Sequence, residues 1–504
     1  MINRDMILGR SCNKSDFQFG PIFVISLFML FFSYASCHPT KGGEIRDQKN
    51  YIIVFTDDQG YQDLGCFGSP DIKTPNIDRM AREGMKFTDF YAQPLCGPSR
   101  AALLTACYPM RVAEYGNQKR KFPYVHGDEI LMPKLLQQAG YTTGMIGKVD
   151  ITMRKKGWKP ELNPVHRGFD FFFGTVGAND DGRPMEIYRN EMVEKRKLAM
   201  GEITSSYTRE ALGFINRNKN KPFLLYIAHT MPHIALGASE QFVGKSGRGL
   251  YGDVMEELDW STGQILKTLE ALNLDRNTIV VYLSDNGPYF LQKAVDFGHA
   301  GSALPLRGSK GTTWEGGMRV PCVMWAPGYI PAGEVCHELA STMDIFPTFI
   351  LQAGAELPDD RVIDGQDISA LMRGDKDAKS PHDAFYYYME SELEAVRSGK
   401  WKIVFPRAHV KDRPWLSRSG NYQKFIPGVF DGVPELMLFN LETDIGEQEN
   451  LASQHPEIIE KLMNDAEQAY GDLGNYNRLG EGARFFEEGE KWPNLAQWRD
   501  HIVK

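Results

Sequence analysis

The sequence lacks an excess of basic residues, an internal repeat and any low-complexity segment. Its 504 residues include 57 lysines and arginines against 65 aspartates and glutamates, for a formal net charge of −8. This balance excludes a general affinity for nucleic acid, so an anionic substrate would need positive charge concentrated in one pocket. With 49 glycines and 28 prolines, the composition is that of a loop-rich enzyme and not of a fibrous or disordered chain.

The amino terminus has the pattern of a secretory signal. Basic residues precede an apolar run at residues 22–32, which is shorter than the roughly 20 residues of a membrane-spanning helix. The run ends in Ser33-Tyr34-Ala35-Ser36-Cys37, which resembles a bacterial lipoprotein cleavage site, although Tyr34 stands where an aliphatic residue is usual. We predict a lipoprotein-type signal peptide at residues 1–36 and lipid on Cys37, which places the protein in the periplasm or at the cell surface. An ordinary signal peptide is the main alternative, and a membrane-spanning anchor is the less favoured one.

Cysteine is scarce, and the seven residues are Cys12, Cys37, Cys66, Cys96, Cys107, Cys322 and Cys336. Export permits disulfide bonds, but a sequence does not show which cysteines pair. Cys322 and Cys336 flank a short turn-rich stretch and are therefore the candidate pair.

Residues 94–111 contain Cys96, the main candidate for a functional cysteine in this sequence. Pro98 suits the first turn of a helix through residues 101–105, so Cys96 would lie at or just before the helix N-terminus. Backbone N–H groups and the helix dipole favour an anion there, and Arg100, one turn on, points its guanidinium back toward it. The alternative is that Cys96 is a buried small hydrophobe, as a lone cysteine before a helix usually is.

Oxygen-bearing side chains follow two apolar, β-branched runs, at residues 50–56 and 277–284, which are typical of strands covered on both faces. The residues that follow directly are Asp57, Asp58, Asp285 and Asn286. One such pair alone would be interpreted as a solvated turn. Two pairs, each at the end of a strand where α/β sheets bind ligands, suit a hard cation such as Ca²⁺ or Mg²⁺ and not zinc.

Two further predicted strands end in nitrogen-bearing side chains. The strand at 142–148 ends in Lys148, and the strand at 221–228 leads to His229 and His233. Taken singly, a lysine after a strand is usually solvated and a lone histidine is usually structural. The role of His229 therefore stays open.

The remaining pattern predicts helices and a smaller second domain, because the chain is too long for one simple core. Thr74 is expected to cap a helix that starts at Pro75, and a long amphipathic helix from 252 to about 272 carries acidic residues that look solvated. The elements predicted for the second domain are antiparallel strands at 385–388, 395–404 and 438–441 and a helix at 456–470.

These motifs, in this order, resemble those of the type I, formylglycine-dependent sulfatases of the alkaline phosphatase superfamily, such as arylsulfatases and N-acetylgalactosamine-sulfatase-like enzymes. The resemblance runs from about Tyr51 to Tyr470. The matching motifs are Asp-Asp-x-Gly-Tyr-x-Asp-Leu-Gly-Cys at 57–66, Thr-Pro-Asn-Ile-Asp at 74–78, Cys-x-Pro-Ser-Arg at 96–100, Gly-Lys at 147–148, Pro-His at 232–233, the Lys-Gly-Thr-Thr-x-Glu-Gly-Gly part of 308–317, and residues 344–348.

The resemblance implies a fold and a set of site residues. The fold is an alkaline-phosphatase-like α/β sandwich at 48–379, with a largely parallel central sheet and helices on both faces, plus a smaller C-terminal α+β domain at 380–504. The implied catalytic residues are Cys96, Arg100, Lys148, His233 and Lys310, of which Lys148, His233 and Lys310 contact the sulfate. The implied ligands of a Ca²⁺ ion are Asp57, Asp58, Cys96, Asp285 and Asn286.

The implied activity is hydrolysis of sulfate esters, and we expect sulfated carbohydrates as substrates. In this family a formylglycine-generating or anaerobic maturation enzyme oxidises the cysteine to an aldehyde, whose hydrate attacks sulfur and later expels sulfate. Two alternatives are a phosphonate or phosphate ester hydrolase of the same superfamily and a non-catalytic glycan-binding lipoprotein. No nucleic acid partner is expected, and contact with a membrane is expected only through Cys37.

Asp150 is the clearest departure from the family, whose members carry histidine at this position after Gly-Lys. An ionised aspartate cannot donate a hydrogen bond, and its charge opposes an anionic substrate. Two interpretations stay open from the sequence. Asp150 either pairs with a nearby lysine such as Lys148 or Lys155, or faces the pocket and accepts hydrogen bonds from sugar hydroxyls.

Overall fold

A computed structural model describes residues 48–112, 125–151, 162–179, 185–195, 197–289, 301–414, 416, 424 and 428–484. The predicted signal peptide and Cys37 lie outside these residues. Within the described residues, no helix combines the length and the apolar character that crossing a membrane requires.

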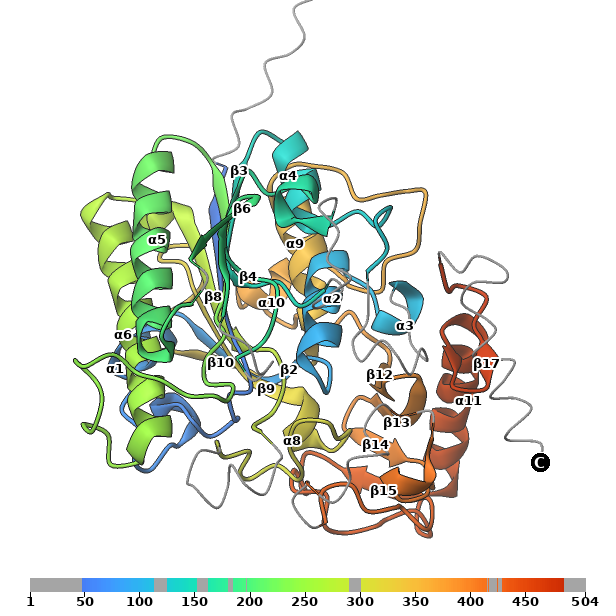
Figure 1. Cartoon of the computed structure of the whole chain (residues 1–504). Helices are drawn as coiled ribbons and strands as arrows, with labels where there is room; N and C mark the ends of the chain where they lie inside the picture. The colour runs from blue at the N-terminus through green and yellow to red at the C-terminus, as the bar shows by residue number, and fades with distance from the viewer. Residues whose placement is uncertain are drawn as a thin grey trace, which may run out of the picture. The chain divides into compact units, whose positions relative to one another are not determined.

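A mixed, mostly parallel sheet forms the centre of the larger part of the fold (Figure 1). Among the described residues it has 11 strands in the order β10-β2-β9-β8-β1-β7-β3-β4-β5-β6, with β11 paired to β2. The strands are β1 Asn50–Thr56, β2 Met85–Tyr91, β3 Thr142–Lys148, β4 Phe171–Thr175, β5 Ile187–Arg189, β6 Met192–Lys195, β7 Phe223–Ala228, β8 Thr278–Ser284, β9 Arg319–Trp325, β10 Glu334–Cys336 and β11 Ala340–Ser341. The five neighbours from β8 to β4 are all parallel.

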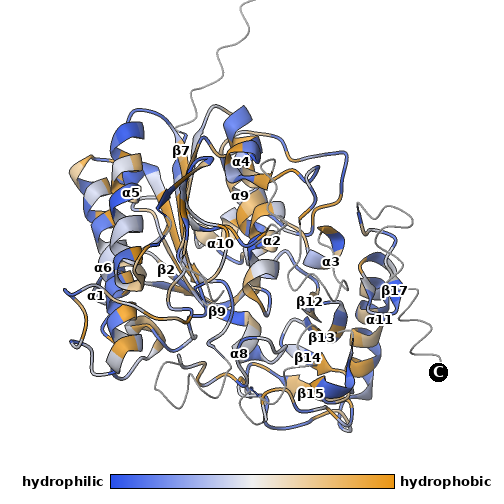
Figure 2. Ribbon diagram, viewed as in Figure 1, coloured by the Kyte–Doolittle hydropathy of each residue, from blue (hydrophilic) through white to orange (hydrophobic). Residues whose placement is uncertain are grey.

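Helices cover both faces of this sheet, as predicted (Figure 1). Because side chains alternate along a strand, Tyr51, Ile53 and Phe55 of β1 pack into one core, while Ile52 and Val54 pack into the other. The first core includes α2 Cys96–Thr105, α4 Met132–Gln138, α9 Ile345–Gln352 and α10 Ser369–Met372, and the second includes α1 Pro75–Glu83, α5 Ile203–Asn218 and α6 Gly249–Ala271. Figure 2 shows the apolar strands between helices that are polar on their outer sides.

A second, antiparallel sheet is formed by the C-terminal part of the chain, in the order β12-β13-β14-β15. Its strands are β12 Phe385–Met389, β13 Glu392–Ser398, β14 Trp401–Val404 and β15 Met437–Asn440, and they are followed by α11 Pro456–Asp472 and the short pair β16 Gly474–Asn475 and β17 Arg478–Leu479. The single strand predicted at 395–404 was wrong, because a turn at Gly399, with φ 55°, splits it into β13 and β14. The domain boundary at 379/380 stays a prediction.

Short helices complete the connections near the site. They are α3 Pro109–Val112 and α8 Glu315–Met318. Both lie beside the C-terminal sheet, because Met110 of α3 and Met318 of α8 pack into the same apolar core as Tyr387 and Leu438. Tyr91 of β2 belongs to the same core, which therefore includes residues of both sheets.

The candidate disulfide between Cys322 and Cys336 is absent, and both residues are free thiols. Each is paired in register with Phe87 of β2, Cys322 from β9 on one side and Cys336 from β10 on the other. Two strand spacings of about 4.8 Å therefore separate their backbones, which is beyond the Cα distance that a disulfide spans.

The acidic face of α6 is buried, which contradicts the prediction of a solvated face. Asp253, Glu257 and Asp259 are each at most 2% exposed. They accept hydrogen bonds from backbone N–H groups of neighbouring segments. Asp259 also caps α1 by accepting from the N–H of Ile77, so the cap predicted for Thr74 is supplied by another helix.

Candidate active site

Four adjacent parallel strands bring the predicted residues to one edge of the sheet. In the order β8-β1-β7-β3, the strands end next to each other, with Thr56 opposite Ser284 and Phe55 opposite Ala228. The polar residues that end or follow these strands are Asp285 and Asn286, Asp57 and Asp58, His229, and Lys148. Segments up to 228 residues apart in sequence meet at this edge, as when Asn286 Nδ2 donates to Asp58 Oδ1 at 2.8 Å.

Helix α2 carries Cys96 and Arg100 into this site. All ten of its residues are buried, so the helix is held by packing on every side. Cys96 is its first residue, as the sequence predicted within one position. The guanidinium of Arg100 donates to Asp285 Oδ2 at 2.7 Å and to the backbone carbonyl of Lys148 at 3.2 Å.

Two lysines pair with different carboxylates of the site. Lys310 Nζ lies 2.6 Å from Asp58 Oδ1 and 4.0 Å from Cys96 Sγ. Lys148 Nζ lies 2.8 Å from Asp57 Oδ2 and 3.2 Å from Asp150 Oδ2. Both lysines are at most 3% exposed, so their charges act in a region that excludes water.

His233 completes the group, since its Nε2 lies 3.5 Å from Asp58 Oδ2. The peptide bond before Pro232 is cis, and Nδ1 of His233 contacts the carbonyl of Ile234. Tyr289, which the sequence reasoning missed, packs its ring against that of His233 and lies under Lys310 Nζ. No sequence signal marked it, because its position is defined only by the loop that follows β8.

Charge pairing governs the ionisation of these groups. Burial opposes the charged form of Asp57, but the cations Lys148, His233 and Arg100 lower its pKa well below the usual range. Burial also opposes a charged Lys310, yet the neighbouring Asp58 raises its pKa. For Cys96, burial raises the thiol pKa to about 11 in spite of the two lysines. Burial therefore outweighs the nearby lysines for the Cys96 thiol, whereas charge pairing outweighs burial for Asp57 and Lys310.

The acidic residues fit a hard cation. One ligand atom each from Asp57, Cys96 and Asp285 lies within 4.8 Å of the others. Asp57 Oδ1 and Asn286 Oδ1 are buried and accept no hydrogen bond from the described residues. Oxygens in this condition are unfavourable unless a ligand pairs with them, and an oxygen-rich set suits Ca²⁺ or Mg²⁺.

His229, whose role the sequence left open, does not join the charged group. Its carbonyl accepts a hydrogen bond from Arg100 at 3.5 Å, while its ring is fully buried 6.1 Å from that of Tyr207. Burial first, and then the charge of Arg100, lower the pKa of His229 to about 3. The ring is therefore neutral at physiological pH and packs near Tyr207.

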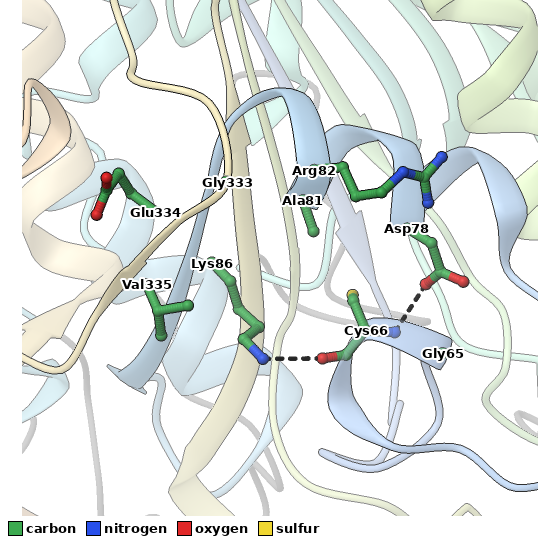
Figure 3. A pocket seen from close by; sticks show the side chains of 9 residues that line it. All are labelled: Gly65, Cys66, Asp78, Ala81, Arg82, Lys86, Gly333, Glu334 and Val335. Carbon is green, nitrogen blue, oxygen red and sulfur yellow. Dashed lines mark hydrogen bonds between the residues drawn. The ribbon is translucent and has the colours of Figure 1, made fainter.

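A surface pocket of about 340 Å³ lies elsewhere (Figure 3). It is lined by residues of the segment from Gly65 to Arg82, of β2 and of the chain around β10, among them Cys66, Lys86 and Val335. Lys86 Nζ is engaged by the carbonyl of Cys66 at 3.0 Å. None of the predicted site residues lines this pocket, so it is separate from the site at the strand ends.

Comparison with known proteins decides the family. Residues 49–355 match the family model described as Sulfatase. The chain belongs to the sulfatase family. Residues 380–488 of this sulfatase match the C-terminal region of aryl-sulfatase, and residues 309–412 match the C-terminal model of N-sulphoglucosamine sulphohydrolase.

Individual relatives agree with this assignment. The sulfatase is 40% identical over 383 residues to N-acetylgalactosamine-6-sulfatase of Canis lupus familiaris, and the match covers 71% of each chain. A solved structure from work on glycosaminoglycan metabolism by Bacteroides thetaiotaomicron superposes with a TM-score of 0.73 at 28% identity, covering 84% of this chain and 99% of that one. The crystal structure of Ps i-CgsB with k-i-k-neocarrahexaose gives 0.71 at 27% identity, covering 90% and 99%.

The family assignment confirms the predicted fold class and enzyme class. The protein is a sulfuric ester hydrolase built on a sulfatase α/β fold. This favours sulfate ester hydrolysis over the two alternatives that the sequence left, a phosphonate or phosphate ester hydrolase and a non-catalytic glycan-binding protein.

Proposed function

We propose that this sulfatase removes sulfate from sulfated carbohydrates and that residue 96 acts as formylglycine. The observation that supports the proposal is the setting of Cys96, which begins a buried helix within 4.0 Å of Lys310 Nζ. In formylglycine an oxygen replaces the cysteine sulfur, so the nucleophilic oxygen of its hydrate would face the same lysine.

The chain's own residues divide the work between binding charge and moving a proton. Lys148 and Lys310 neutralise sulfate oxygens, and Arg100 holds Asp285 while it adds positive charge at the helix N-terminus. The leaving alcohol oxygen needs a proton, and His233 or Lys310 donates it. Burial of both lysines strengthens these interactions by excluding water.

The cation in this proposal is Ca²⁺, held by Asp57, Asp58, Asp285 and Asn286 together with residue 96. When bound, it supplies further neutralisation of the sulfate oxygens. Elemental analysis of the active enzyme tests the assignment. About one calcium per chain is expected, whereas stoichiometric zinc would refute it.

The carbohydrate substrate is supported by the relatives and not by the site itself. The curated relative is named for N-acetylgalactosamine 6-sulfate chemistry, and one structural neighbour holds a neocarrahexaose. The test is a panel of sulfated mono- and oligosaccharides, with an aryl sulfate and the matching aryl phosphate as references. Turnover of at least one sulfated sugar, at a higher kcat/KM than the aryl phosphate, is expected. Hydrolysis of the phosphate alone would overturn the proposal.

Maturation and location complete the proposal. A formylglycine-generating or anaerobic maturation enzyme is the required partner, and Cys37 is proposed to carry lipid that tethers the protein to a bacterial envelope. Lipoprotein processing supplies the several acyl chains that stable anchoring needs. Fractionation of the native host tests this, because a soluble protein with an N-terminus other than residue 37 contradicts it.

A further inference from the structure

The loop that carries Lys310 is fixed on its active-site side by backbone hydrogen bonds. The N–H of Lys310 donates to the carbonyl of Pro288 at 2.9 Å, and that of Gly311 donates to Pro94 at 2.8 Å. The hydroxyl of Thr312 donates to the carbonyl of Ser309 at 2.7 Å and closes the turn around Lys310. The lysine is therefore tied to the segments just before residue 96 and just after β8.

The other side of the same loop is held by Lys402 of β14, in the second sheet. Lys402 Nζ donates to the carbonyl of Thr313 at 2.8 Å and lies 2.9 Å from Glu315 Oε1. It also lies 2.7 Å from Glu447 Oε1, and Glu447 in turn accepts from the N–H of Glu315 at 2.8 Å. These three polar contacts of the Lys402 ammonium all lead to the segment 313–315, directly or through Glu447.

Glu394 of β13 makes a second attachment to this segment. Its Oε2 accepts from the hydroxyl of Thr313 at 2.5 Å, and its carboxylate is held by Arg407 and Arg413. The C-terminal sheet thus contacts both the side chain and the carbonyl of Thr313, three residues after Lys310.

The buried charges around Lys402 are not explained by a gain in stability. Lys402, Glu315 and Glu447 are fully buried. Burial would raise the pKa of Glu315, but Lys402 and Arg319 hold it at about 2, so the carboxylate is ionised. Buried ion pairs add little net stability compared with apolar packing, and their best-attested use is to specify one geometry.

We infer that Lys402 is a positioning residue for Lys310: the second sheet uses it to fix the loop that presents Lys310 to the substrate. The inference rests on the proposed function, in which Lys310 contacts the sulfate. It gives the C-terminal sheet a defined part in the reaction, which Lys402 exerts through the segment 313–315 and not through a contact with the sulfate.

The test compares variants that loosen the loop with one that removes Lys310 itself. Lys402→Met removes the ammonium and keeps a long side chain, and Thr313→Val removes one hydroxyl with almost no change of shape. Because a displacement of about 1 Å can reduce a rate by roughly a hundredfold, Lys402→Met should lower kcat about ten- to a hundredfold. Thr313→Val should lower kcat less, and it keeps the test valid if Lys402→Met fails to fold.

A double-mutant cycle separates positioning from a general structural effect. If Lys402 acts through Lys310, Lys402→Met should change kcat by less than about twofold in a Lys310→Ala background. The matched control is Arg111→Met, which removes another buried cation between the two parts of the chain: Arg111 lies 2.7 Å from Asp364 and 2.5 Å from Asp472 of α11. This control should lower thermal stability and leave kcat close to that of the wild type.

Affinity for inorganic sulfate gives a readout that does not need turnover. Lys402→Met, Thr313→Val and Lys310→Ala should all weaken sulfate binding in calorimetry, and Arg111→Met should not. Multiplicative losses in the cycle, or equal losses of kcat in Arg111→Met, would overturn the inference. A wild-type protein that hydrolyses no sulfate ester would refute the proposed function instead, while the sulfate affinities would still decide the role of Lys402.

Discussion

Lys148 forms ion pairs with both Asp57 and Asp150, and this arrangement determines the expected effect of substituting Asp150. Asp150 is fully buried, lies 3.2 Å from Lys148 Nζ, and has a left-handed backbone with φ 48°. Of the two interpretations that the sequence left open, this geometry favours pairing with Lys148 over contact with sugar hydroxyls. Lys155 lies outside the described residues.

Asp150→Ala should therefore lower kcat/KM by the same factor on a sulfated sugar and on a small aryl sulfate. A lost hydrogen bond to a charged group is worth about 1.5–3 kcal/mol, so the factor should be roughly tenfold or more. Parallel kinetics on the two substrates measure it, with Asp150→Asn as the control of equal size. A loss confined to the sugar would restore the substrate-contact interpretation.

Cys96→Ala should fold and be inactive. The sulfur lies 4.0 Å from Lys310 Nζ, which is a weak contact, so its removal leaves the helix packing in place. Truncation of a small buried group should cost about 1 kcal/mol, which thermal unfolding would detect as a minor shift. Mass spectrometry of the active wild type should show formylglycine at residue 96. An active preparation that carries only the thiol would contradict the mechanism.

His382 should make the protein less stable as the pH rises. Burial opposes its charged form, but Asp344, 2.7 Å away, raises the pKa of His382 above 6.5. The stabilisation is complete below pH 6.5, the value in the unfolded chain, and is lost as the pH rises through the higher folded pKa. Thermal unfolding of the wild type and His382→Gln across this range tests the sign. A difference between them that grows with pH would refute it.

At the scale of whole elements, α6 provides carboxylates that accept hydrogen bonds from the backbone of neighbouring segments. Its buried carboxylates reach the N-terminus of α1 and the loop at 244–246. A helix N-terminus has N–H groups without intrahelical partners. A carboxylate there accepts hydrogen bonds from them, and its negative charge interacts favourably with the positive end of the helix dipole. The long helix therefore contributes specific polar contacts as well as an apolar face.

Asp259→Ala should lower the free energy of unfolding by about 2 kcal/mol, near the upper end for the loss of a helix cap. The reason is that the N–H groups of Asn76 and Ile77 lose their acceptor inside the protein. Denaturant unfolding measures the change, and Lys267→Ala, an exposed position on the same helix, is the control. A loss no greater than that of Lys267→Ala would mean that water replaces the cap.

For the molecule as a whole, the cation is the largest charge expected in the site. A ligand that binds only the folded state stabilises it by about 2.7 kcal/mol at 100 times its Kd. We expect a chelator to lower the Tm and Ca²⁺ to restore it. In Asp57→Asn both effects should shrink, because the site loses negative charge. An unchanged Tm in the chelated wild type would contradict a cation at this position.

The sequence by itself determined strands β1, β3, β7 and β8 and the polar residues at their ends. A strand buried on both faces needs a continuous apolar run. Such a run consists of consecutive residues, so it can be recognised in the sequence without knowledge of the tertiary structure. The polar residues after each run could therefore be assigned to one edge of a parallel sheet. The family could also be predicted from the sequence, because each motif is a short run of consecutive residues and the order of the motifs along the chain is visible without a structure.

Only the tertiary structure decided which charges meet. The acidic residues of α6 looked solvated because a sequence does not show that loops pack over them. The pairing of Lys402 with Glu315, across 87 positions, depends on how the two sheets dock. The failed pairing of Cys322 with Cys336 depends on the insertion of β2 between their strands. Contacts between distant segments follow from the packing of the whole chain, which no local pattern encodes.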